Sequence, residues 1–148
     1  MKYIKKYSSL IVESVRDDLQ EFCELNLAYL LDEDFVISIR RRDNLPRGMK
    51  DHKQGFVICF GVRVEDGVID NNAGFTWNDI TNHFIPFLQR LSQSYTIDKS
   101  IMVRLQQGYP YGHETKMVRP TSMMNHDLML DVFADKLIRN ISISVEEE

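Results

Sequence analysis

The chain has 148 residues, of which 43% are hydrophobic and 27% charged, and its formal net charge is -4. These values exclude wholesale disorder and are ordinary for a globular chain of single-domain length. No apolar stretch approaches the roughly 18 residues needed to span a bilayer, and acidic residues follow the N-terminus too early for a secretory signal. Cys23 and Cys59 are the only cysteines, which excludes a disulfide framework and a cysteine-rich zinc site. We therefore expect one cytoplasmic domain covering residues 1–148, with reduced thiols in or near its core and no membrane partner.

The first predicted element is a long amphipathic helix from Ile4 to Leu31, a stretch without glycine or proline. Its predicted buried stripe follows three- and four-residue spacing through Ile4, Tyr7, Ile11, Val15, Leu19, Phe22, Leu25 and Tyr29. The opposite face is acidic, with Glu13, Asp17, Asp18, Glu21 and Glu24. The acidic residues 32–34 stand where the helix dipole disfavours negative charge, so we expect the helix to end there.

Two strands are predicted next, at residues 35–41 and 56–65, because apolar residues alternate with others in both. The second strand is the more apolar of the two, so we expect it at the centre of the sheet. The segment between them is polar and contains Pro46, Gly48 and Gly55, which favours an antiparallel hairpin with a long tip.

A second helix is predicted after residue 75. Thr76 and Asp79 have capping-box spacing, and Phe75 with Ile80 has the spacing of a hydrophobic staple. Pro86 lies inside the helix and is expected to kink it. The predicted apolar stripe consists of Trp77, Ile80, Phe84, Leu88, Leu91 and Tyr95, while Ile85 and Phe87 fall outside it. We therefore expect this helix to contact apolar surface on more than one side.

The last predicted elements are strands at residues 101–106 and 138–146. In the latter strand, Leu137, Ile141, Ile143 and Val145 are expected to share one face. The pattern leaves open whether the intervening residues 108–136 contain a further strand or a short helix. The predicted order αββαββ indicates an α+β fold, with two principal helices on one face of a mainly antiparallel sheet of four or more strands.

The hairpin tip is the first candidate functional surface. Residues 40–53 carry a net charge of +4, which leaves -8 on the rest of the chain. The positive residues are Arg40, Arg41, Arg42, Arg47, Lys50 and Lys53. They could bind an acidic protein surface, this protein's own acidic helix or nucleic acid phosphates, or form only a solvated tip. The tip has no aromatic residue for stacking on bases, which weighs against a reader of single strands.

The second candidate surface is the glycine-bracketed segment 108–116. Tyr109 and Tyr111 are suited to an interface, and His113, Glu114 and Lys116 follow them as residues of a functional loop. Met117, Met123, Met124 and Met129 surround this segment with a methionine cluster. Such a cluster is ordinarily core filler, but it can also form an adaptable binding face.

Two enzyme interpretations start from the same segment. Asp98 with Glu114-Thr115-Lys116 resembles the carboxylate and E-x-K pair of restriction-endonuclease-like nucleases, which implies a magnesium ion held by Asp98 and Glu114 with Lys116 beside it. His113-Glu114-Thr115 resembles one half of the paired H-x-[ST] signature of two-histidine phosphoesterases. The second half is missing, because His52, His83 and His126 are not followed by Ser or Thr two positions later.

No catalytic set, metal-ligand spacing or cofactor motif is complete in the sequence. We therefore expect a non-enzymatic protein-interaction module without a cofactor or metal, acting as a subunit of a homo-oligomer or larger assembly. Opposite charges on the acidic helix and the basic tip would permit head-to-tail contacts between copies. The alternatives are a nucleic-acid-binding accessory factor that uses the basic tip and a small metal-dependent nuclease or phosphoesterase.

Overall fold

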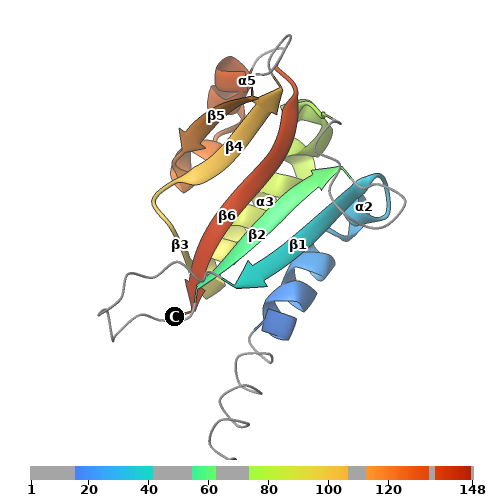
Figure 1. Cartoon of the computed structure of the whole chain (residues 1–148), viewed down its shortest axis with the longest axis vertical. Helices are drawn as coiled ribbons and strands as arrows, with labels where there is room; N and C mark the ends of the chain where they lie inside the picture. The colour runs from blue at the N-terminus through green and yellow to red at the C-terminus, as the bar shows by residue number, and fades with distance from the viewer. Residues whose placement is uncertain (1–15, 42–54, 63–73, 107–112, 134–135, 148) are drawn as a thin grey trace, which may run out of the picture.

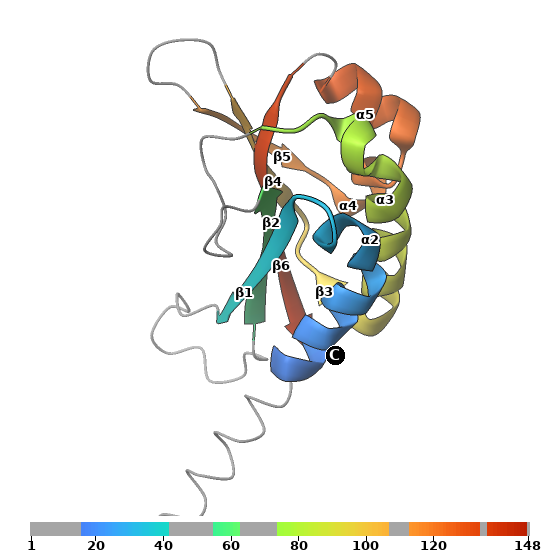
Figure 2. The same ribbon diagram turned by 90° about the vertical axis from the view of Figure 1, so that its right-hand side faces the viewer.

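The computed structural model describes residues 16–41, 55–62, 74–106, 113–133 and 136–147. Within these ranges six strands form one antiparallel sheet, and helices cover one of its faces (Figures 1 and 2). The strands are β1 (Phe35–Arg41), β2 (Gly55–Val62), β3 (Tyr95–Ile97), β4 (Ile101–Gln106), β5 (His113–Val118) and β6 (Ile138–Glu147). The helices are residues 16–26, α2 (Ala28–Leu31), α3 (Trp77–Ser94), α4 (Pro120–Met123) and α5 (His126–Phe133). This arrangement confirms the α+β class.

The sheet order is β1-β2-β6-β4-β5, and β3 pairs with β6 beyond the start of β4. All four predicted strands are present, although residues 63–65 lie outside the described ranges. The predicted order αββαββ is extended by β3, β5, α4 and α5. The strand β2 is an interior strand between β1 and β6, as predicted for residues 56–65, but the middle position in the sheet order belongs to β6, which pairs with β2, β3 and β4. Both strands are rich in apolar residues, and composition alone does not rank them.

The N-terminal helix is present from residue 16 and has a turn at Leu27 before α2 continues it. Its buried side chains are Leu19, Cys23, Leu27 and Leu30. The predicted stripe is right at Leu19 and Phe22 and wrong at Leu25 and Tyr29, which are 72% and 60% exposed. A step of three residues falls about 60° short of a full turn, and successive steps of three therefore move around the helix. Residues 4–15 of the predicted helix lie outside the described ranges.

The helix α3 runs from Trp77 to Ser94 and is continuous through the exposed Pro86. The Asp79 carboxylate accepts a hydrogen bond from the Thr76 N–H at 2.9 Å, as the capping-box spacing predicts. All residues of the predicted stripe that lie in α3 are buried, and Phe87 is buried as well. Phe84 is the centre of an aromatic cluster, with ring centroids 5.3 Å from Phe60, 5.6 Å from Phe87 and 6.2 Å from Trp77.

The central strand β6 contains an irregularity that reverses which residues face the helices. Asn140 lies opposite Arg104 and Ile138 lies opposite Leu105, so Arg139 is an extra residue and forms a β-bulge. Ile138 is consequently buried whereas Leu137 is 41% exposed, which corrects the predicted face. Ile138 also exchanges two backbone hydrogen bonds with Phe75, at 2.9 and 2.7 Å. Ile138 therefore lies opposite Leu105 of β4 on one side and pairs with Phe75, just before α3, on the other.

Candidate interaction surface

The strand β5 forms one edge of the sheet. Within the described residues it pairs only with β4, from Ile101 opposite Val118 to Gln106 opposite His113. Residues 114, 116 and 118 lie opposite buried residues of β4 and share the face that the helices cover, whereas 115 and 117 share the open face. An edge strand has backbone N–H and C=O groups available to a further strand.

The helices α4 and α5 flank this edge on the helix-covered face (Figure 2). Asn125 caps α5, because its Oδ1 accepts a hydrogen bond from the Leu128 N–H at 3.1 Å. The α5 helix is held on α3 by Phe133, whose ring centroid is 6.1 Å from that of Trp77, and by a 2.8 Å contact between His126 Nδ1 and Thr81 Oγ1. These contacts anchor α5 to α3.

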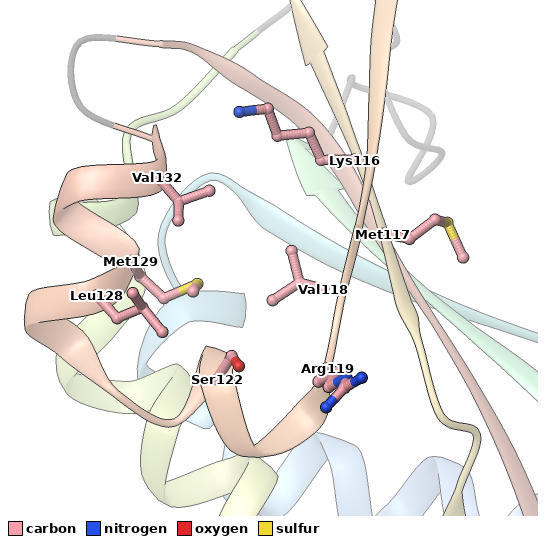
Figure 3. Close-up of a pocket in the computed structure, with 8 residues that line it drawn as sticks. All are labelled: Lys116, Met117, Val118, Arg119, Ser122, Leu128, Met129 and Val132. Atoms are coloured by element: carbon pink, nitrogen blue, oxygen red, sulfur yellow. The ribbon is translucent and has the colours of Figure 1, made fainter.

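A hollow of about 400 Å³ lies between β5 and the two short helices (Figure 3). It is lined by Lys116, Met117, Val118, Arg119, Ser122, Leu128, Met129 and Val132. Lys116 and Val118 point from β5 toward α5, and Met117 points to the other side of the strand. Leu128 is 41% exposed at the hollow and Met117 is 57% exposed on the open face of β5, so this edge presents apolar contact area on both faces beside two basic side chains.

An ion pair lies near the N-terminal end of β5. Lys136, just before β6, donates from Nζ to Oε2 of Glu114 at 3.3 Å. Both side chains are partly exposed, so the pair contributes at most about 1 kcal/mol to stability. Its structural effect is to hold the Glu114 carboxylate on the helix-covered side of β5, two residues from Lys116.

The residues predicted for the second candidate surface fall partly on this edge. Glu114 and Lys116 belong to the regular strand β5, so the prediction of a loop is wrong for them, and the backbone of His113 begins that strand. Tyr109 and Tyr111 lie outside the described ranges. Met123 and Met129 are buried core residues and Met124 is half-buried. Met117 is therefore the exposed member of the methionine cluster.

The residues predicted for the basic tip lie elsewhere. Arg40 and Arg41 are exposed at the end of β1, the opposite edge of the sheet, roughly 19 Å from β5 at about 4.8 Å per strand. Arg42, Arg47, Lys50 and Lys53 lie outside the described ranges. The two candidate surfaces therefore do not combine into one site through Arg40 and Arg41.

The residues of the nuclease interpretation are also separated. Asp98 precedes β4 and its N–H donates to the Ser144 carbonyl, whereas Glu114 lies opposite Leu105 near the far end of β4. The four strand steps from Ile101 to Leu105 alone correspond to about 13 Å, and Asp98 lies before them, so these carboxylates cannot share one cation in this structure. The described residues contain no group of three or more His, Cys, Asp and Glu side chains that could hold a metal ion.

Sequence reasoning missed the hollow and its residues Arg119, Leu128 and Val132, as well as Lys136. The alternation of residues 113–118 is a strand signal, but the neighbouring glycines and tyrosines favoured a loop. Within the described ranges, no helix is long and apolar enough to cross a bilayer. Neither a protein-family model, nor a curated protein, nor a solved structure matches this chain.

Proposed function

We propose that this protein is a non-enzymatic interaction module, a subunit of a homo-oligomer or larger assembly, and that its contact surface is the β5 edge with the adjacent hollow. The observation that carries the proposal is the combination of an edge strand with a hollow of about 400 Å³ directly beside it. An added strand would gain main-chain hydrogen bonds from β5, and its side chains on the helix-covered face would enter the hollow.

The chemistry of the lining supports a protein partner. Met117 and Leu128 are among the few large apolar side chains that are exposed in the described residues. Methionine adapts its shape to a partner, and a few apolar anchors surrounded by polar groups are typical of protein interfaces. Lys116 and Arg119 would favour a segment that brings carboxylates to the rim.

The proposal is tested by selecting binders from a random peptide library and measuring their affinity by fluorescence anisotropy. Leu128→Asp places a charge in the lining of the hollow and is expected to weaken binding about tenfold or more, because an apolar contact is lost. Leu137→Asp is the matched control, since Leu137 has the same 41% exposure and does not line the hollow.

Met117→Asp tests the strand itself and should weaken binding as well. The proposal is wrong if no peptide is enriched, or if Leu128→Asp and Leu137→Asp change the affinity equally. Circular dichroism of each variant checks that the fold is retained.

A further inference from the structure

We infer that the partner at the β5 edge is the β5 strand of a second copy, paired antiparallel about a two-fold axis at Thr115, with Glu114 of each copy opposite Lys116 of the other. The inference rests on the proposed function and names its partner. In this arrangement the two sheets become one continuous sheet and the helices of both copies cover the same face.

The geometry of β strands restricts which residues can face each other across such a dimer. Opposing residues of neighbouring strands have their side chains on the same face of the sheet. Glu114, Lys116 and Val118 share the helix-covered face of β5. Glu114 of one copy must therefore lie opposite residue 114, 116 or 118 of the second copy.

Charge distinguishes these three registers. A two-fold axis at residue 114 places Glu114 opposite Glu114, and an axis at residue 116 places Lys116 opposite Lys116. Like charges directly opposite each other are destabilising, whereas opposite charges are favourable. An axis at Thr115 is the one register of the three that produces opposite charges, and symmetry produces that pair twice.

The register at Thr115 also suits the remaining residues. It pairs residues 113–117 of the two copies and brings Thr115 opposite Thr115 on the open face, a favourable cross-strand pair. Lys136 already holds Glu114 at the edge, and a carboxylate can accept hydrogen bonds from several donors. Because the hollow lies beside residues 116–119, C-terminal to Thr115, the antiparallel pairing places the hollows of the two copies at opposite ends of the paired strands.

The position of Lys116 explains how such an edge would remain selective. A lysine on the covered face of an edge strand discourages pairing with arbitrary strands, because the pairing would leave its charge without a partner. A strand that supplies a carboxylate opposite Lys116 removes this penalty. The β5 sequence itself supplies that carboxylate, so the same residue rejects other strands and accepts a copy of its own.

The experiment measures mass in solution by sedimentation equilibrium from low micromolar to near-millimolar concentration. The wild-type protein should reach the mass of two 17.4 kDa chains. Lys116→Glu gives a chain with two glutamates at the edge, and Glu114→Lys gives one with two lysines. Each variant alone should dimerise about tenfold more weakly or worse, because both cross-strand pairs become repulsive.

Mixing the two variants provides the decisive measurement. A chain with two lysines and a chain with two glutamates are complementary in the register at Thr115, so the mixture should recover dimers that each contain one chain of each kind. One variant is uniformly labelled with nitrogen-15, so that native mass spectrometry can distinguish these heterodimers, because exchanging Lys for Glu by itself hardly changes the mass. Lys99→Glu, at an exposed site before β4, is the control for the change in net charge and should leave dimerisation unaltered.

The inference is overturned if the wild-type protein stays monomeric throughout, if the single variants dimerise as well as the wild type, or if the mixture does not form heterodimers. Its failure remains distinguishable from failure of the proposed function. Peptide binding that depends on Leu128, without charge-dependent dimers, rejects the second copy as the partner and retains the β5 edge as an interaction surface.

Discussion

Cys23 illustrates how strongly a single position depends on its surroundings. Its side chain is fully buried on the inner face of the N-terminal helix, whereas Cys59 is partly exposed on β2 with its Sγ 3.6 Å from Ser142 Oγ. Burial, with a smaller contribution from the Glu24 carboxylate, raises the pKa of the Cys23 thiol from its ordinary value of 9.0 to about 12. Cys23 is therefore an unreactive core residue in the folded protein, in agreement with its prediction as a reduced core thiol.

This raised pKa predicts a loss of stability at alkaline pH. Above about pH 9 the Cys23 thiol ionises in the unfolded chain and stays protonated in the folded one, so the unfolded state binds fewer protons. The free energy of unfolding should then fall by about 1.4 kcal/mol per pH unit toward pH 12. Denaturant unfolding of the wild type and of Cys23→Ala isolates this contribution from other titrating groups.

The expected result is that the stability difference between these two proteins narrows as the pH rises from about 9. A difference that stays constant over this range would show that the Cys23 thiolate is tolerated in the fold. Below pH 9 the contribution of the thiol should be fully present and independent of pH.

At the scale of elements, the N-terminal helix shows how packing selects a face. Its buried side chains, from Leu19 to Leu30, are spaced by four, four and three residues, and this spacing places all of them on one side of the helix. Phe22 is partly buried and packs on the same core, with its ring centroid 6.3 Å from that of Phe87 on α3. Tyr29 instead stacks on His83 at the surface, with centroids 4.4 Å apart.

The two leucines at positions 25 and 27 provide a matched test of this face. Leu27→Ala should lower the free energy of unfolding by about 2–5 kcal/mol, because it removes a fully buried side chain and leaves a cavity. Leu25→Ala should change it by less than about 0.5 kcal/mol, because that side chain is exposed. Equal effects in chemical denaturation would mean that the helix packs through another face.

At the scale of the whole molecule, the described residues form two layers, a sheet and the helices that cover one of its faces. One core unites the N-terminal helix, α3 and α5 with the inner faces of β1, β2, β4 and β6. The centre of the sheet is protected by neighbours on both sides, and β1 and β5 each have one strand neighbour within the described residues. Stability should therefore decrease from the centre toward both edges.

Hydrogen exchange measured by NMR tests this gradient. Backbone amides of β6 between Ile141 and Val145 should exchange most slowly, because their opening requires global unfolding. Amides at the β1 edge should exchange faster at every protein concentration. Protection of β5 should rise with concentration if a second copy pairs there. Fast exchange in β6 would contradict the strand order.

Local patterns were sufficient for much of this structure. Alternation in residues 35–41 and 56–62 and the stripe from Trp77 to Leu91 predicted three main elements, because a residue's burial there depends on its own strand or helix period. The capping pair Thr76 and Asp79 was likewise predictable from adjacent residues. Glu114 and Lys116 were recognised as candidate site residues from sequence, although not as members of an edge strand.

Other features depend on contacts between distant residues and are decided only by the tertiary structure. The bulge at Arg139 adds one residue to β6, and this reverses the faces of Leu137 and Ile138 without any change in composition. The strand order, the pairing of Lys136 with Glu114 and the hollow beside β5 each require segments far apart in the chain to meet. Sequence alone therefore determined which residues form the main strands and helices, whereas packing determined which strand is central, which strands lie at the edges and where the hollow lies, because these properties belong to pairs of elements and not to any one of them.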